Sequence, residues 1–284
     1  MTLALAIPRV IDALRQTSGW GAGAVPVTGT GSQRAVPGLE AGACMSYAPT
    51  NVRLNKTVFV DAGHGGLDPG VVGTSASGRL VQEKDATLAV ATRLTTLLRA
   101  DGFDVVMART QDTTVVKLSD ADSNYGSITS SAVRRDLVAR AACANAAGAD
   151  ALLSIHFDGF SDPAVGGTET FYDSARPFAA ANRKLATTVQ SALVASLGAP
   201  DRGVWTDDQL AAPTLTVSGQ RYGHLIELGP PSPGWVDNPS KMPGALVEPL
   251  FVTNPSEARI ASDPRGQDKI AQALDAGLQK FLSA

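Results

Sequence analysis

The chain has 284 residues, enough for one large α/β domain with an extension. Hydrophobic residues make up 44% and charged residues 18%, which is ordinary for a globular protein. The formal net charge is −3, so the sequence does not indicate the basic face that nucleic-acid binders carry. Because no apolar stretch approaches the roughly 20 residues of a membrane-spanning helix, we expect no transmembrane segment.

The first 55 residues show few signs of regular structure. Residues 17–55 are rich in Gly, Pro, Ser and Ala without periodicity, which predicts an arm or linker. A short helix over Pro8–Arg15 would precede it. The segment Met1–Ile7 lacks a basic region before its apolar residues and is a poor secretory signal as written. Export would therefore need a signal further upstream or a different route.

From residue 56 onward, strand and helix patterns alternate. Thr57–Asp61 is a β-branched run that predicts a buried strand, and Glu83–Ala100 has apolar residues at helical spacing. The later elements are a strand over Phe103–Ala108, a helix beginning at Thr129 or Ser130 and ending before Gly148, strands over Asp150–His156 and Thr168–Tyr172, a helix over Ala179–Leu197, a strand over Ala245–Glu248 and a helix over Gln267–Leu282. This order predicts an α/β fold: a mostly parallel, twisted sheet of about six strands with helices on both faces.

The two cysteines, Cys44 and Cys143, fit either redox compartment and are too few for a disulfide-dependent scaffold. A disulfide between them would tie the arm to the second predicted helix. The alternative is that Cys143 is a small buried residue without a partner. Its position on the apolar face of that helix favours this second interpretation.

Two of the three histidines lie where predicted strands end. His64 follows the first strand in a glycine-rich turn, His156 closes the third strand, and Glu83 opens the first helix near the same sheet edge. Two histidines and a glutamate with one open position are a common arrangement for catalytic zinc. Taken singly, such histidines are usually turn residues and such a glutamate a helix-dipole partner. The spacing alone therefore leaves both readings open.

Four ordered blocks carry a family resemblance. The blocks are Val58–Gly70, Glu83–Asp85 followed by Leu88, Arg140 and Asn145 with Ser154–His156, and Met242–Glu248 with Phe251 and Asn254. With these blocks, the sequence from residue 58 to the end resembles the zinc-dependent N-acetylmuramoyl-L-alanine amidases of the amidase-3 family.

The resemblance implies one zinc ion per chain, with His64, Glu83 and His156 as its ligands and Glu248 as the catalytic carboxylate. Zinc lowers the pKa of bound water from about 15.7 to about 7, and Glu248 would pass the water proton to the leaving amine. The substrate would be peptidoglycan or a muropeptide, cut between N-acetylmuramic acid and L-alanine. The resemblance also implies export to the cell wall, the periplasm or the medium, and leaves room for an unidentified regulatory protein.

The sequence departs from the family pattern in two places. Pro249 follows the catalytic glutamate, where the family usually has a small residue, and an insert occupies about 206–241 of the amidase domain, which itself covers 56–284. The insert holds His224 and Glu227, and the residues around Glu227 imitate the catalytic strand. Glu227 is therefore an alternative catalytic residue, although only Glu248 has the family context on both sides. The insert itself has the length of a surface loop or a lid.

Two other functions compete with amidase activity. One is a non-catalytic wall-binding or activator module on the same fold, which the retained ligand positions argue against. The other is a zinc peptidase acting within stem peptides, which only an analysis of the products separates from an amidase.

Overall fold

The computed structural model describes residues 27–210 and 217–283, and the expected helix over Pro8–Arg15 lies outside them. In the described part, an eight-stranded sheet has the order β1-β2-β6-β3-β9-β12-β10-β11. Its strands are β1 (Ser32–Gln33), β2 (Ala43–Tyr47), β3 (Thr57–Ala62), β6 (Asp104–Arg109), β9 (Ala151–Ile155), β10 (Thr168–Tyr172), β11 (Asp201–Thr206) and β12 (Gly244–Glu248). Two small hairpins lie apart from it: β4 (Val72–Thr74) with β5 (Leu80–Gln82), and β7 (Ser123–Asn124) with β8 (Ser127–Ile128).

The centre of the sheet is parallel. β6, β3, β9 and β12 run the same way side by side. β10 pairs antiparallel with β12 and parallel with β11, while β2 is antiparallel to both β6 and β1. The predicted fold class is confirmed, with eight strands in place of about six.

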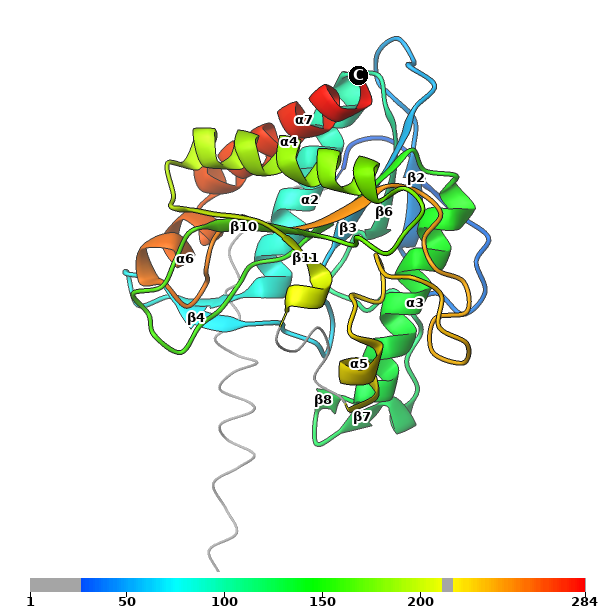
Figure 1. Cartoon of the computed structure of the whole chain (residues 1–284), viewed down its shortest axis with the longest axis horizontal. Coiled ribbons are helices and arrows are strands. Elements are labelled where there is room, and N and C mark those ends of the chain that lie inside the picture. Colours follow the sequence, from blue (N-terminus) through cyan, green and yellow to red (C-terminus); the bar gives the residue numbers. More distant parts are fainter. Residues whose placement is uncertain (1–26, 211–216, 284) are drawn as a thin grey trace, which may run out of the picture.

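Helices cover both faces (Figure 1). α2 (Glu83–Ala100), α4 (Ala179–Leu197) and α7 (Pro264–Leu282) pack on one face, and α3 (Ser130–Ala147) packs on the other. The remaining helices are η1 (Asp120–Asp122), η2 (Asp207–Gln209), α5 (Val217–Tyr222) and α6 (Pro255–Ser262). Successive side chains of β3 point to opposite faces of the sheet, and each face has its own hydrophobic core. Val58 and Val60 face α2 and α7, while Phe59 faces α3.

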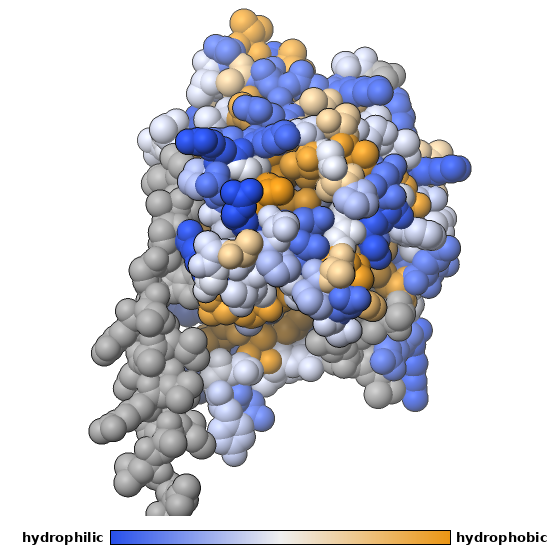
Figure 2. Space-filling model, turned by 90° about the vertical axis from the view of Figure 1, so that its left-hand side faces the viewer, coloured by the Kyte–Doolittle hydropathy of each residue, from blue (hydrophilic) through white to orange (hydrophobic). Residues whose placement is uncertain are grey.

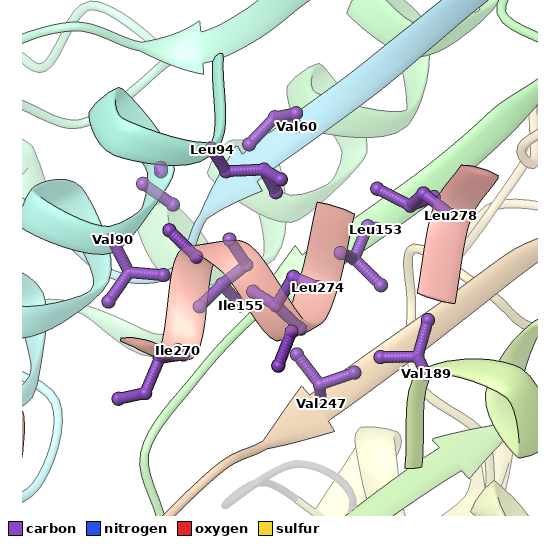
Figure 3. Close-up of a cluster of buried hydrophobic side chains, with 14 of the residues drawn as sticks. Val60, Val90, Leu94, Leu153, Ile155, Val189, Val247, Ile270, Leu274 and Leu278 are labelled. Carbon is purple, nitrogen blue, oxygen red and sulfur yellow. The ribbon is translucent and has the colours of Figure 1, made fainter. Parts of the chain in front are cut away.

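The larger core lies between the sheet and α2, α4 and α7. Figure 3 shows Leu274 and Leu278 of α7 directed at side chains of the strands, among them Leu153 and Val247. All four of these side chains are fully buried. Because β3, β9 and β12 are parallel neighbours, they end at the same edge of the sheet.

The predicted arm needs correction where the structure describes it. Residues 43–47 form β2, which pairs with β6 inside the sheet and has a buried alanine, cysteine and tyrosine. The strand was missed because five residues without clear alternation, in a Gly- and Pro-rich context, resemble a loop. In the described part of the chain, every helix is too short or too polar to cross a bilayer.

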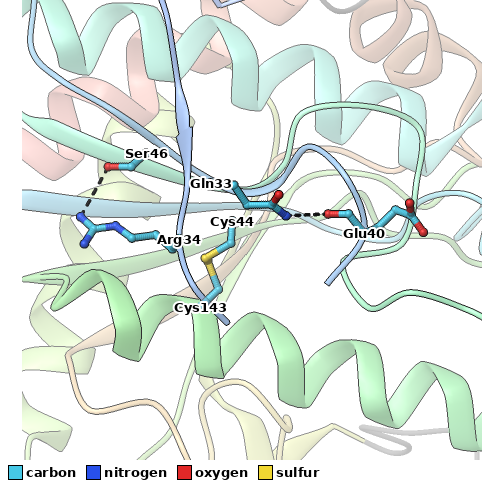
Figure 4. The surroundings of a disulfide bond; sticks show 6 residues. All are labelled: Gln33, Arg34, Glu40, Cys44, Ser46 and Cys143. Carbon is cyan, nitrogen blue, oxygen red and sulfur yellow. Dashed lines mark hydrogen bonds between the residues drawn. A yellow bond between two sulfur atoms is a disulfide. The ribbon is translucent and has the colours of Figure 1, made fainter. Parts of the chain in front are cut away.

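Cys44 and Cys143 form a disulfide, contrary to the interpretation that the sequence favoured (Figure 4). Their Cα atoms are 5.7 Å apart, and the bond joins β2 to α3. Cys143 is indeed buried on the apolar face of α3, but β2 brings Cys44 against it. Because the cysteines are 99 residues apart, the loop-entropy account assigns such a bridge about 4–5 kcal/mol, the value for a loop of roughly 100 residues.

Candidate active site

His64, Glu83 and His156 meet at the edge where β3 and β9 end. His64 Nε2 lies 3.0 Å from Glu83 Oε1, and His156 Nδ1 lies 2.9 Å from the same oxygen. The two imidazole nitrogens are 3.2 Å apart. One carboxylate oxygen and two ring nitrogens therefore converge on a single point, as the sequence predicted from strand ends.

The backbone conformation around these residues lets the side chains of the site lie close together. His64 has a φ of 60°, an uncommon value for a residue with a side chain and one that functional sites often impose. A Cβ on Gly63 would lie 2.4 Å from Cε1 of His156, so only glycine leaves room for that ring. Glu83 is the first residue of α2, which places its carboxylate at the positive end of the helix dipole.

Hydrogen bonds hold the three side chains in place. The amides of Phe157 and Val71 donate to the two oxygens of Glu83, at 3.0 Å and 2.8 Å. On the other side of its ring, His64 Nδ1 lies 2.9 Å from Asp68 Oδ2. Metal-binding histidines usually make such a second contact, with a carboxylate, a backbone carbonyl or water, and it sets the tautomer and the ring direction. Asp68 lies in the first family block, but its contact with His64 could not be predicted from the sequence.

The donor set fits zinc. In a tetrahedral site with contacts of about 2.1 Å, donor atoms lie roughly 3.4 Å apart, close to the separations observed here. The surroundings also favour positive charge: burial opposes a charged imidazole, but the carboxylates of Glu83 and Asp68 raise the pKa of His64 to about 10. Burial likewise opposes the anion of Glu83, yet the histidines hold the pKa of that carboxyl well below its usual range. The site therefore attracts cations.

Glu248 ends β12 beside this centre. Its Oε2 is buried and has no hydrogen-bond partner. Burial raises the pKa of Glu248 well above its usual range, and the negative charges of Glu83, Asp158 and Glu169 raise it further. A carboxyl in such surroundings readily takes up a proton. Pro249 follows β12 without breaking its pairing with β9 and β10.

A cavity of about 460 Å³ joins these residues to an apolar wall. His64, His156 and Glu248 line one part of it. The rest of the lining is mainly apolar, and most of it comes from β8, α3 and the insert, including Ile128, Val133, Leu137, Leu225, Leu228 and Trp235. Figure 2 shows hydrophobic side chains gathered in a hollow low on one face, at the height where Figure 1 shows α3 and α5. The insert is thus part of the cavity wall.

Glu227, the alternative catalytic residue, lies in a different environment. It is 4% exposed, lines the cavity, and has no hydrogen-bond partner on either oxygen. Burial raises its pKa well above the usual range, and Asp61 and Asp136 add to this while Arg140 opposes it.

Arg140 organises the backbone next to the centre. Its guanidinium pairs with Asp61 and Asp136, at 2.6 Å and 2.7 Å, and donates to the carbonyl oxygen of His64 at 2.8 Å. Asn145, also in a family block, donates to Pro239 O at 3.0 Å. Both residues therefore position the site and the insert from α3.

Comparisons with known proteins find relatives along most of the chain. The family model for N-acetylmuramoyl-L-alanine amidase matches residues 58–280. The amidase LytC of Bacillus subtilis is 31% identical over 231 residues, which are 81% of this chain and 36% of LytC. The germination-specific N-acetylmuramoyl-L-alanine amidase of the same species is 31% identical over 84% of this chain and 85% of its own length.

Solved structures share the fold. The CwlD amidase of Clostridioides difficile, solved in complex with the GerS lipoprotein, superposes with a TM-score of 0.63 at 27% identity, over 81% of this chain and 99% of that one. An N-acetylmuramoyl-L-alanine amidase from Clostridium difficile 630 gives a TM-score of 0.58 at 28% identity, over 81% and 97% of the two chains. The chain belongs to the amidase-3 family of N-acetylmuramoyl-L-alanine amidases, which are hydrolases of peptidoglycan.

Proposed function

We propose that the chain binds one zinc ion at His64, Glu83 and His156 and uses Glu248 to cleave the amide between N-acetylmuramic acid and L-alanine. The observation that carries this is the convergence of the three donor atoms, 2.9–3.2 Å apart, on the cavity that Glu248 also lines. Asp68 would hold the ring of His64 for ligation, and the two backbone amides would hold Glu83.

When bound, zinc supplies Lewis acidity toward the amide carbonyl and acidifies water at its open position. Glu248 accepts the proton of the attacking water while the water oxygen bonds to the carbonyl carbon of the muramic acid lactyl group. The carbon–nitrogen bond then breaks, and Glu248 returns the proton to the departing nitrogen of L-alanine. The raised pKa of Glu248 suits the first step, because burial and the neighbouring carboxylates make its carboxylate a stronger base than an exposed one.

We also propose that the chain works outside the cytoplasm. The disulfide between Cys44 and Cys143 supports this, since such bonds persist in oxidising compartments. A relative from Staphylococcus aureus, 26% identical, is named a probable cell wall amidase. The expected regulatory protein stays a prediction; the complex of CwlD with a lipoprotein is a precedent in a related chain. A cysteine bridge that forms only after cell lysis would contradict an extracytoplasmic location.

Digestion of muropeptides followed by mass spectrometry tests the proposed reaction. We expect release of stem peptides with a free L-alanine amino terminus, and no release by Glu248→Gln. A zinc peptidase would instead leave L-alanine attached to muramic acid, and a wall-binding module would release nothing while still sedimenting with peptidoglycan.

A further inference from the structure

A second group of metal-binding side chains lies outside the centre described above. Asp173 follows β10, Asp207 opens η2, and His224 lies in the insert after α5. Their ligand atoms all lie within 4.8 Å of one another. His224 Nδ1 is 2.9 Å from Asp173 Oδ2 and 3.3 Å from Asp207 Oδ1. One nitrogen and two carboxylate oxygens, from three separate segments, thus face each other.

Backbone amides orient both carboxylates toward the histidine. The amide of Ala175 donates to Asp173 Oδ1 at 2.8 Å, and the amide of Leu225 donates to Asp207 Oδ2 at 2.9 Å. In each case the other oxygen is the one that faces His224. Glu83 is held by backbone amides in the same way, and ligating carboxylates commonly have such support.

One of these oxygens lacks a hydrogen bond. Both aspartate side chains are 0% exposed, whereas that of His224 is 20% exposed. The Nδ1 atom makes its hydrogen bond with Asp207, and Asp173 Oδ2 accepts no hydrogen bond although it lies 2.9 Å from Nδ1, a contact that is an ion pair only if His224 is protonated. A single N–H cannot serve two carboxylates, and a buried carboxylate without a partner is costly. Arg176 does not relieve it by a hydrogen bond, because its guanidinium donates to the carbonyl oxygens of Gly229 and Ser240.

We propose that Asp173, Asp207 and His224 bind a second divalent cation of the zinc type. A cation between the three atoms would satisfy Asp173 Oδ2 and offset the charge of two buried carboxylates. Imidazole nitrogen combined with carboxylate oxygen is a donor set that zinc accepts, whereas calcium and magnesium favour oxygen alone. The partial exposure of His224 leaves room for water as a further ligand.

The position of this site suggests what the ion does. It would fasten η2 and the segment at His224 to the end of β10. Leu225, whose amide is held by Asp207, lines the active-site cavity. The ion would therefore stiffen the cavity wall that the insert supplies, a structural role distinct from that of the amidase centre.

Zinc titration of the purified full chain, stripped with a chelator beforehand, tests the proposal. We expect two equivalents bound by the wild type, one by His224→Gln, one by Asp207→Asn, one by His156→Ala and none by the His156→Ala/His224→Gln double variant. Asp208→Asn is the matched control, because this neighbouring carboxylate is exposed, and it should keep two equivalents. Zinc should also raise the Tm of His156→Ala but not of the double variant.

The alternative occupant of this position is a proton on His224, which would make an imidazolium between two carboxylates. In that case the wild type binds one equivalent, His156→Ala removes it, His224→Gln leaves it unchanged, and the proposal fails. One equivalent that disappears with His224→Gln but survives His156→Ala would support this site and refute the amidase centre instead. If Asp207→Asn does not fold, the zinc stoichiometry of His224→Gln decides the question, because the side chain of His224 is partly exposed and its replacement disturbs the fold less.

Discussion

Glu248 and Glu227 end two similar stretches of sequence, but different neighbours surround their carboxyl groups. Both are buried, and burial is the main reason that the pKa of each is raised. For Glu248 the next cause is the charge of Glu83, a proposed zinc ligand, whereas for Glu227 it is Asp61, with Arg140 opposing. Of the two glutamates, only Glu248 therefore has its pKa raised by the charge of a proposed zinc ligand.

Replacing each glutamate by glutamine separates their roles. Glu248→Gln cannot accept the water proton, so we expect the rate to fall by at least roughly 10²–10⁴-fold, with zinc retained at the centre. Glu227→Gln should stay within about 10-fold of the wild type, because glutamine keeps the size of the side chain and the charges that act on Glu227 are those of Asp61, Arg140 and Asp136, not those of the proposed zinc ligands. Turnover on a defined muropeptide, with zinc content checked, gives the answer. A dead Glu227→Gln beside an active Glu248→Gln would reverse the assignment.

Asp68 offers a second residue-scale prediction. Asp68→Asn keeps the shape of the side chain but removes the charge next to His64 Nδ1. We expect zinc affinity at the amidase centre to fall about 10–100-fold, the usual cost of losing such a supporting group. Competition with a chromophoric chelator measures this, and the exposed Asp208→Asn is the control. Unchanged affinity would show that Asp68 does not support the ligand.

Strand ends placed His64, Glu83 and His156 at one edge of the predicted sheet, but this spacing left their role open, and only the family resemblance implied that they bind zinc. The sequence could not identify Asp68, whose contact depends on the left-handed backbone at His64. Nor could it identify the cluster at His224, because that cluster forms only when the insert folds against β10.

At the scale of elements, the long helices were predictable and the marginal strands were not. α2 and α4 have the predicted bounds, and Thr129 caps α3 through a hydrogen bond from Ala132 N. β11 was missed because none of its six residues is buried, so no alternation of buried and exposed side chains marks it. α6 was missed although Asn254 caps it and Pro255 opens it, since its eight residues are too few for a clear period.

The bridge between β2 and α3 should be a major source of stability. Replacing both cysteines by serine, or reducing the wild type, should lower the free energy of unfolding by about 2–5 kcal/mol. Urea unfolding with and without reductant measures the difference. Labelling the thiols of unfolded, unreduced protein is the control: two labelled cysteines would exclude the bridge.

The contact of α7 with the end of α2 should make stability depend on pH. Burial, then the charge of Asp101, raises the pKa of Asp275 to about 7, well above the value near 3.9 in an unfolded chain. Protonated Asp275 therefore stabilises the fold fully below about pH 4, and this stabilisation is lost as the pH rises through about 7.

Asp275→Asn removes this dependence. The difference in unfolding free energy between the variant and the wild type should shift in favour of the variant by on the order of 1 kcal/mol when the pH is raised from 4 to 8. Urea unfolding at both pH values measures the gain, with the exposed Asp208→Asn as control. A constant difference between the variant and the wild type would refute the shifted pKa.

At the scale of the whole molecule, the family match begins at residue 58, next to the start of the first predicted strand. The described part of the arm adds β1 and β2 to the far edge of the sheet, and the disulfide holds it there. The insert, by contrast, adds no strand at that edge of the sheet in its described residues and forms part of the cavity wall. Neither placement could be predicted, because both depend on contacts between segments far apart in the sequence.

The central claim is that a zinc centre built from His64, Glu83 and His156 cuts the bond between muramic acid and L-alanine. Mass spectrometry of muropeptides after digestion by the untreated, chelated and zinc-restored protein tests it most directly. We predict stem peptides with a free L-alanine terminus from the untreated protein, none after chelation, and full recovery with zinc in the wild type but not in His156→Ala. Stem peptides released equally well by His156→Ala, or products that keep L-alanine on muramic acid, would contradict the account.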